Sequence, residues 1–426
     1  MNPIRGPVRV AFLTHEPFHP PSGGGSAEAI YLVREFVARG HSVHLFCPDF
    51  PDREAVAERF GVTLHPFTRW KMGRYTRLRN LKYLLYPSAL AAQVLKVDRD
   101  LAAAGSTTTG AFDLLFAQHT ISAVAAGRLR SRLGIPAVFN FLDYLTGFME
   151  TWPAWVMPGP VVRALTRFEL GMPKRFSADG ILTVSTPLAE RFAATGFPAE
   201  RIRAIQYGYD ATLFKPAPAT SAETRSDAAR NPVIVMHGSF DQHHLGPIAA
   251  VAIQRVVKTI PNAVFRFVGR ETPALRHFIS ALRTKIPGIR IELTGFVPYE
   301  SVPAHLINAD VGMVPYEESN GTHCAFVAKA VEYLGCGIPV ASTPLENLRR
   351  YFADEPAIRF SGFDGESFAR TILEILQQPK TERTRAGLAA SVRVARELDW
   401  SQVTGSAVDF VERVAREKRN KLGSAH

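Results

Sequence analysis

Twice along this chain of 426 residues, short apolar runs alternate with longer helical stretches. In the first series the run VRVAFLT at 8–14 is almost wholly apolar, as expected for a parallel strand covered on both faces. The second series begins with VIVMHG at 233–238, after a segment at 216–232 that is rich in Pro, Ala, Ser and Thr and has no large apolar residue. Alternation of this kind predicts doubly wound parallel sheets. The sequence therefore predicts an α/β protein with two Rossmann-like domains separated by a linker.

The limits of these domains follow from the same pattern. We expect an N-terminal domain over 1–210, a linker over 211–232, a C-terminal domain over 233–395, and a C-terminal helix over 396–426 that packs back toward the first domain. Further strands are expected at 41–48, 113–118, 136–141, 180–185, 263–269, 290–295, 311–316 and 338–342, and helices at 247–259, 273–285, 299–308 and 326–335. In open α/β sheets ligands bind beyond the carboxyl ends of the strands, so the loops after the strands are the places to seek chemistry.

Composition narrows the class of protein. The three cysteines are an odd number without ligand spacing, so we expect neither a disulfide framework nor a zinc site, and a reducing, cytoplasmic location fits best. No apolar window approaches the length of a membrane-spanning helix, and the N-terminal apolar run is interpreted as a first strand rather than a signal peptide. The net charge of +11 favours an anionic partner, which is a nucleic acid, a membrane surface or a phosphorylated substrate.

Three blocks, in the same order, resemble the retaining glycosyltransferase family 4, also called glycosyl transferases group 1. They are FLTHEPFHPPSGGGSAEAIYLVREFVARGHSV at 12–43, ILTVSTPLAERFAATGFPAERIRAIQYGYDATLFKP at 181–216 and CAFVAKAVEYLGCGIPVAST at 324–343. The resemblance covers nearly the whole chain and implies the GT-B fold, with two Rossmann-like domains facing across a cleft. It also implies a hexosyltransferase that moves a sugar from a UDP- or GDP-sugar to an acceptor hydroxyl with retained anomeric configuration. No cofactor and no metal ion are then expected.

Glu332 is the leading candidate for the donor site. A carboxylate accepts two hydroxyl donors at once, which suits the vicinal diol of a nucleotide ribose. The resemblance makes Glu332 the second of two family glutamates, and it places Cys324 where the first would stand. Ala325, Phe326 and Val327 continue the family pattern, and their backbone amides are expected near the phosphates. We expect the Glu332 carboxylate to be open to the cleft; the alternative is an ordinary exposed helix glutamate.

Three further residues are candidates for the donor diphosphate. Lys329 lies one helical turn before Glu332, where an ammonium would complement phosphate charge, and the alternative is an ion pair between the two. After the strand at 233–238, Ser239 and His244 stand where the family has an arginine and a lysine. A histidine can donate to phosphate, but its ordinary pKa is near 6.5. These departures motivate a second hypothesis, a non-catalytic glycosyltransferase-like binding protein.

The first domain supplies three further donor-binding candidates and two catalytic candidates near the acceptor. Gly23, Gly24 and Gly25 offer backbone N–H groups at a helix start, where a phosphate or a sugar can approach closely. His119 and Asp143 each follow a predicted strand and are the candidate catalytic residues. For His119 a hydrogen-bonded surface histidine is an equally good interpretation.

Two segments suggest a membrane partner. RWKMGRYTRLRNLKYLLY at 69–86 interleaves cations with aromatic residues, and FMETWPAWVMPGP at 148–160 is a second apolar cluster that can act as a wedge or an acceptor lid. We expect peripheral binding to the inner membrane face and a lipid-linked or glycan acceptor in polysaccharide or glycolipid biosynthesis. The alternative is a solvated basic helix with buried aromatics. Although the charge would suit nucleic acid, nothing in the domain pattern resembles a nucleic-acid-reading module, and no such partner is expected.

Overall fold

The computed structural model describes residues 7–21, 24–67, 82–105, 111–217, 231–241 and 243–423. The chain forms two compact units, the first made of Met1–Gln206 with Ser401–His426 and the second of Tyr207–Trp400. The predicted strands and helices are present, and most of their bounds agree to within two or three residues.

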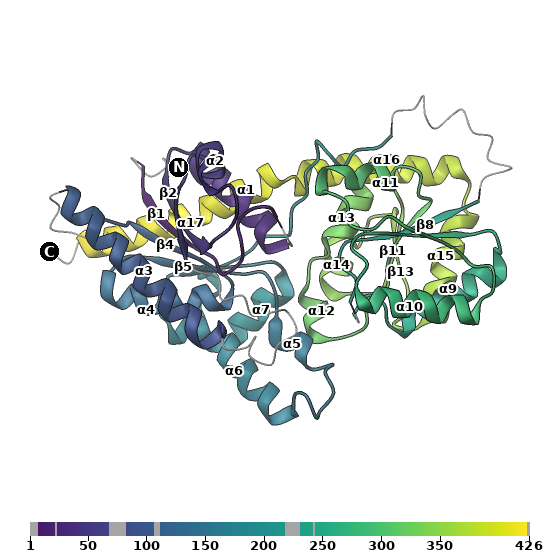
Figure 1. Cartoon of the computed structure of the whole chain (residues 1–426), viewed down its shortest axis with the longest axis horizontal. Coiled ribbons are helices and arrows are strands. Elements are labelled where there is room, and N and C mark those ends of the chain that lie inside the picture. The colour runs from purple at the N-terminus through teal and green to yellow at the C-terminus, as the bar shows by residue number, and fades with distance from the viewer. Residues whose placement is uncertain are drawn as a thin grey trace. The chain divides into compact units, whose positions relative to one another are not determined.

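The first unit is built on a seven-stranded parallel sheet with the order β3-β2-β1-β4-β5-β6-β7 (Figure 1). β1 pairs with both β2 and β4, so the strand order reverses there, and the carboxyl ends of β1 and β4 frame the switch point at which such sheets bind ligands. The strands are β1 (Arg9–Leu13), β2 (Ser42–Pro48), β3 (Thr63–Phe67), β4 (Leu114–Gln118), β5 (Ala137–Phe141), β6 (Gly180–Thr183) and β7 (Ile202–Ala204).

Helices cover both faces of this sheet, and α3 lies beside α4 (Figure 1). Its central strands β1, β4 and β5 are buried along their length or nearly so, which explains their apolar sequences. The helical elements are α1 (Gly24–Ala38), α2 (Arg53–Phe60), α3 (Lys82–Gly105), α4 (His119–Leu133), α5 (Leu145–Met149), α6 (Gly159–Arg175), α7 (Thr186–Ala194), η2 (Ala199–Arg201) and α17 (Trp400–Gly423).

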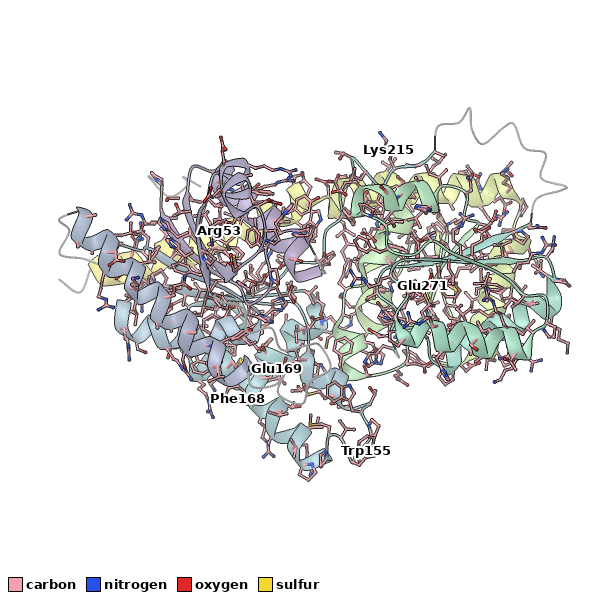
Figure 2. All side chains as sticks on the ribbon, in the orientation of Figure 1. Arg53, Trp155, Phe168, Glu169, Lys215 and Glu271 are labelled. Atoms are coloured by element: carbon pink, nitrogen blue, oxygen red, sulfur yellow. The ribbon has the colours of Figure 1, made fainter. Side chains whose placement is uncertain are left out.

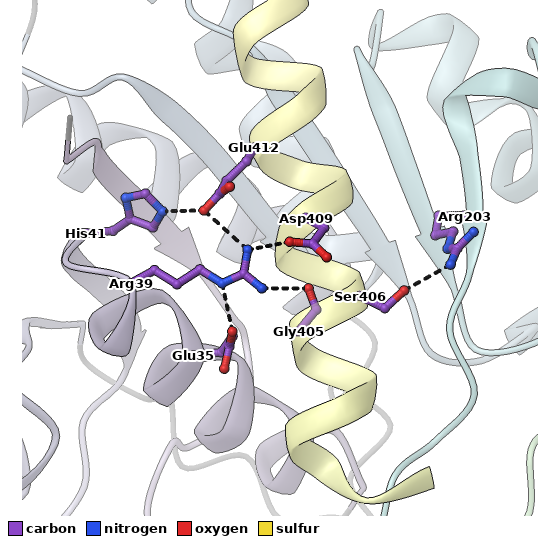
Figure 3. Close-up of polar contacts among 8 residues, drawn as sticks. All are labelled: Glu35, Arg39, His41, Arg203, Gly405, Ser406, Asp409 and Glu412. Atoms are coloured by element: carbon purple, nitrogen blue, oxygen red, sulfur yellow. Dashed lines mark hydrogen bonds and ion pairs between the residues drawn. The ribbon is translucent and has the colours of Figure 1, made fainter. Parts of the chain in front are cut away.

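From Ser401 onward α17 belongs to the first unit, and polar contacts hold it there (Figure 3). Arg39, just after α1, donates to Asp409 at 2.6 Å and to the carbonyl of Gly405 at 2.9 Å. His41 pairs through Nε2 with Glu412 at 3.0 Å. These contacts tie α17 to the segment between α1 and β2.

The second unit repeats the design with a six-stranded parallel sheet in the order β10-β9-β8-β11-β12-β13. Its switch point lies between β8 and β11. The strands are β8 (Val233–His237), β9 (Val264–Val268), β10 (Arg290–Leu293), β11 (Val311–Val314), β12 (Val340–Ser342) and β13 (Ile358–Phe360). The helical elements are α9 (Pro247–Thr259), α10 (Pro273–Lys285), η4 (Tyr299–Ser301), α11 (Val302–Leu306), α12 (Asn320–Cys324), α13 (Ala328–Gly335), α14 (Glu346–Tyr351), α15 (Gly365–Gln377) and α16 (Lys380–Leu398). α9 and α15 pack against each other over a core of Ile, Val and Phe side chains.

Candidate active site

In the second unit the candidate residues gather at the carboxyl end of β8. The strand ends at His237, the loop from Gly238 to His244 follows, and α13 carries Lys329 and Glu332 beside it. Gly238 has φ of +102°, a conformation that favours glycine, and a Cβ there would lie 3.8 Å from Cε of Lys329. The chain therefore turns tightly over the lysine.

Glu332 is not the open carboxylate that the sequence led us to expect. Its side chain lies within the second unit and is only 6% exposed. Oε2 is hydrogen bonded to Nε2 of His237 at 2.5 Å, and Oε1 accepts from the hydroxyl of Tyr299 at 3.0 Å. The expectation of an exposed group is wrong because two protein partners, distant in sequence, satisfy the buried charge.

Lys329 is a buried cation. It is 7% exposed, and among the described residues its Nζ has no hydrogen-bond partner. Nζ lies 5.1 Å from the centroid of the Tyr316 ring, a cation–π contact. Burial lowers the pKa of Lys329 to about 8, against the opposing charges of Asp241 and Glu332. Lys329 therefore stays largely charged at pH 7, with ammonium hydrogens available to a ligand. The carboxylate of Glu332 pairs with His237 instead, so the ion pair expected between Lys329 and Glu332 is not formed.

The loop after β8 contains one accessible and one buried candidate. Ser239 is exposed, whereas His244 is buried with Nδ1 2.7 Å from Oδ1 of Asp241. Burial, and then the charge of Lys329, lowers the pKa of His244 to about 4. His244 is therefore neutral at pH 7 in the free protein, and it would carry charge only when a bound anion raises its pKa.

The segment before α13 differs in part from the prediction. Cys324 is completely buried, and its short thiol cannot extend toward a ligand as a glutamate would. The amide of Ala325 already donates to the carbonyls of Gly321 at 3.0 Å and Thr322 at 3.3 Å, and the prediction that it is free for a phosphate is therefore wrong. Phe326 and Val327 are buried just before α13, with Val327 at its N-cap.

In the first unit, Gly25, His119 and the carboxylate of Glu16 lie together at the switch point between β1 and β4. Residues 23–25 are called the glycine turn below. Gly24 begins α1, and Gly25 is packed so closely that a Cβ there would lie 2.4 Å from Nε2 of His119 and 2.5 Å from Oε2 of Glu16. His119 itself has φ of +66° at the start of α4, which is rare for a residue with a side chain. Gly23 lies outside the described residues.

Sequence reasoning missed Glu28, a buried carboxylate on α1. Its Oε2 accepts from the side-chain amides of Gln118 at 3.0 Å and Asn140 at 2.8 Å. Burial raises the pKa of Glu28 to about 7. The signal that could have found it is the pair of amides, one ending β4 and one within β5, in otherwise apolar strands.

Asp143 follows β5 and is accessible to solvent. Partial desolvation by the surrounding protein, and then the charges of Glu16 and Glu169, raises its pKa. Glu169 on α6 is buried, and it accepts from the backbone amides of Leu145 at 2.9 Å and Thr146 at 2.8 Å. The start of α5, two residues after Asp143, is thus fixed to α6.

The two segments that suggested a membrane partner differ in how much the structure describes. Residues 68–81, most of the basic aromatic segment, lie outside the described residues. The segment 148–160 is described, and in it Trp155 is 87% exposed. Over the described ranges, no helix has the length and apolarity needed to cross a bilayer, and no cluster of three metal-ligand side chains occurs.

Comparison with known proteins agrees with this two-part architecture. The Glycosyl transferase 4-like domain matches residues 23–208, and the Glycosyl transferases group 1 domain matches residues 231–378. A D-inositol 3-phosphate glycosyltransferase of Thermobispora bispora is 22% identical over 305 residues, which are 68% of this chain and 68% of that protein.

Solved structures share the fold. HepE of Anabaena, in complex with UDP and glucose, has a TM-score of 0.67 at 16% identity, covering 95% of this chain and 100% of that one. The sucrose-phosphate synthase of Thermosynechococcus elongatus has a TM-score of 0.70 at 17% identity, covering 98% and 100%. The two domain matches follow one another in the order of the two units and together span most of the chain. The chain therefore belongs to the group 1 glycosyltransferases of family 4, with the GT-B fold.

Proposed function

We propose that this glycosyltransferase moves a hexose from a nucleoside-diphosphate sugar to an acceptor hydroxyl with retained anomeric configuration. The observation that carries the proposal is Lys329, a buried ammonium without a hydrogen-bond partner among the described residues, beside the end of β8. A buried charge is costly unless it is paired. The diphosphate of a donor would supply the missing partner.

Glu332 would bind the ribose of this donor. His237 and Tyr299 each occupy one oxygen of its carboxylate, and each oxygen has a second lone pair to offer. A ribose diol can share these lone pairs, or it can displace the Tyr299 hydroxyl. The two protein contacts would fix the carboxylate in position before the donor arrives.

The first unit would hold the acceptor. Burial gives Glu28 a pKa near 7, so it can change its protonation state near neutral pH, and the pKa of Asp143 is raised as well. Asp143 is the accessible member of this pair and, with His119, would contact the acceptor hydroxyl. Glu28, held by Gln118 and Asn140, would position the residues around it rather than touch the substrate.

The charge of the departing diphosphate would be balanced by this chain's own groups. Lys329 is the first of them, and His244 is the second if phosphate binding raises its pKa. Transfer would then require neither a cofactor nor a metal ion. UDP is the first nucleotide to test, because HepE is crystallised with UDP and glucose.

The proposal also covers the acceptor and the cellular location. We place the enzyme in the cytoplasm at the inner membrane face, acting on a glycan or lipid-linked acceptor in polysaccharide or glycolipid synthesis. The net charge of +11 and the cation-rich sequence at 69–86 support this location.

The test combines binding with turnover. Thermal shift is measured with UDP, GDP and their sugars, for the wild type, for Lys329→Met and for the control Lys285→Met on the exposed surface of α10. We expect one nucleotide to stabilise the wild type and the control but not Lys329→Met. Nuclear magnetic resonance of the product would then report its anomeric configuration. Binding without turnover on any acceptor or on water would favour the non-catalytic alternative.

A further inference from the structure

The segment between α5 and α6 exposes an unusual concentration of apolar side chains. Half of the large hydrophobic residues that are exposed in the described part of the chain lie between Trp152 and Leu165. The members are Trp152 at 41%, Trp155 at 87%, Val156, Val161 and Leu165. Figure 2 shows Trp155 at the end of the projecting loop, far from the packed layers of the first unit. Clusters of this kind mark interaction surfaces.

The exposed tip is an ordered structure. The amide of Trp152 donates to the carbonyl of Met149 at 3.1 Å, and that of Val156 donates to Pro153 at 2.8 Å. At the base, Glu169 ties α6 to α5 through its bonds with Leu145 and Thr146. Two successive turns therefore present the tryptophans on a short helical hairpin that is closed at its base.

The charges from the two tryptophans through the first half of α6 are basic, and the exposed Glu150 precedes them. Residues 151–168 contain no aspartate or glutamate. Arg163 and Arg167 are exposed, lie four residues apart on α6, and have no ion-pair partner among the described residues. Tryptophan at the boundary and arginine at the head groups is the combination that binds anionic interfaces.

We infer that the α5–α6 hairpin, residues 145–167, is a wedge that inserts Trp152 and Trp155 into the interface of an anionic lipid bilayer. Arg163 and Arg167 would contact the lipid phosphates. The inference rests on the proposed membrane location but not on the transfer reaction. It identifies which part of the first unit meets the lipid, and Asp143, two residues before α5, would then lie at the root of the inserted element.

Flotation with vesicles tests the wedge. The full chain is mixed with vesicles of phosphatidylcholine, alone or with phosphatidylglycerol. We expect the wild type to bind the mixed vesicles. Trp152→Ala combined with Trp155→Ala should lower the partition coefficient by about tenfold or more, since each indole buries a large apolar area. Trp155→Phe should retain most binding. Arg163→Gln with Arg167→Gln should lose about fivefold per arginine, and only on anionic vesicles.

A matched control comes from α16, where Val392 is 69% exposed and the Arg396 side chain 73% exposed. Val392→Ala with Arg396→Gln should float like the wild type. Circular dichroism of each variant checks that the fold is retained. The wedge is overturned if the tryptophan variant floats normally, if neutral and anionic vesicles bind equally, or if the wild type never floats. It is also overturned if vesicle-free sedimentation shows a dimer that the tryptophan variant dissociates. An enzyme that turns over sugar nucleotide yet never floats would leave the proposed reaction intact.

Discussion

His237 and Glu332 are joined by a hydrogen bond of 2.5 Å, although 95 residues separate them in the sequence. The contact fixes α13 to the end of β8. Tyr333, the next residue, strengthens it because its hydroxyl accepts from the His237 amide at 3.0 Å. The residue proposed to bind ribose is therefore part of the framework of the second unit. Its substitution should affect both the ligand and the fold.

Variants of Glu332 separate these two effects. Glu332→Ala should weaken UDP binding by about 2 kcal/mol, or roughly thirtyfold, because the charge-assisted bonds to the ribose are lost. Glu332→Gln keeps the volume and one acceptor oxygen, so it should lose less. Tyr299→Phe removes one of the two contacts that position the carboxylate but keeps the carboxylate itself, so it should weaken UDP binding less than Glu332→Ala does. Isothermal titration calorimetry measures all three, and unchanged affinity in Glu332→Ala would refute the ribose role.

Lys329→Met should stabilise the free protein while abolishing its response to the diphosphate. The folded-state pKa of about 8 lies below the unfolded value of 10.5, so the unfolded chain holds more protons between these values. Stability therefore rises with pH from about 8 to 10.5, and below pH 8 the charged lysine costs at most about 3 kcal/mol. Urea unfolding at pH 7 and pH 10.5 should show the variant's advantage at the lower pH and its decline at the higher one. An equal difference at both would contradict the buried charge.

Glu28→Gln should change the pH dependence of stability in the opposite sense. The folded-state pKa of about 7 exceeds the ordinary value of 4.5, so the folded chain binds the extra proton between these values. Stability therefore falls as pH rises from about 4.5 to 7, by at most about 3 kcal/mol for this group. Urea titrations from pH 4.5 to 8 should show a shallower fall in the variant. The control is Glu58→Gln, on the exposed side of α2, and a slope in Glu28→Gln equal to that of the wild type would contradict the assignment.

The strand pattern was readable from sequence where strands are buried on both faces. The strands that sequence analysis missed are β3, β7 and β13, and each lies at the edge of its sheet. Their residues are mostly half-buried, so no continuous apolar run marks them. Apolar periodicity reports burial, and these three strands have too little of it.

The candidate site was predicted less completely than the fold. Lys329 and Glu332 were found because they share one helix, but their surroundings come from residues far away in the chain. Tyr299 reaches Glu332 from 33 residues away. Glu28 was missed because only the apolar face of its helix was interpreted. The two amides that hold it lie 90 and 112 residues away in the sequence. Such pairings are set by the tertiary structure, which local pattern does not encode.

Arg39→Gln should loosen α17 from the first unit. The arginine side chain is 25% exposed. It pairs with the carboxylates of Glu35, Asp409 and Glu412 and donates to the carbonyl of Gly405, as Figure 3 shows, so its loss should cost about 2 kcal/mol. Hydrogen exchange should accelerate in α17 first. Arg413→Gln is the control, because its pair with Glu417 is about half exposed on both sides and should contribute under about 0.5 kcal/mol. Equal exchange in both variants would show that the Arg39 contacts do not hold the helix.

Gly25→Ala tests whether the glycine turn and His119 act as one acceptor site. The added Cβ would meet Nε2 of His119 at 2.4 Å and Oε2 of Glu16 at 2.5 Å, so both side chains must move. Because both residues lie in the first unit, we expect kcat/KM for the acceptor to fall by about two orders of magnitude. Small displacements of reacting groups cause losses of this size. The affinity for UDP should stay unchanged. Gly171→Ala on α6 is the matched control, since its Cβ would meet nothing within 4 Å. Full activity in Gly25→Ala would mean that His119 and Glu16 do not position the acceptor, and weakened UDP binding would move the glycine turn to the donor.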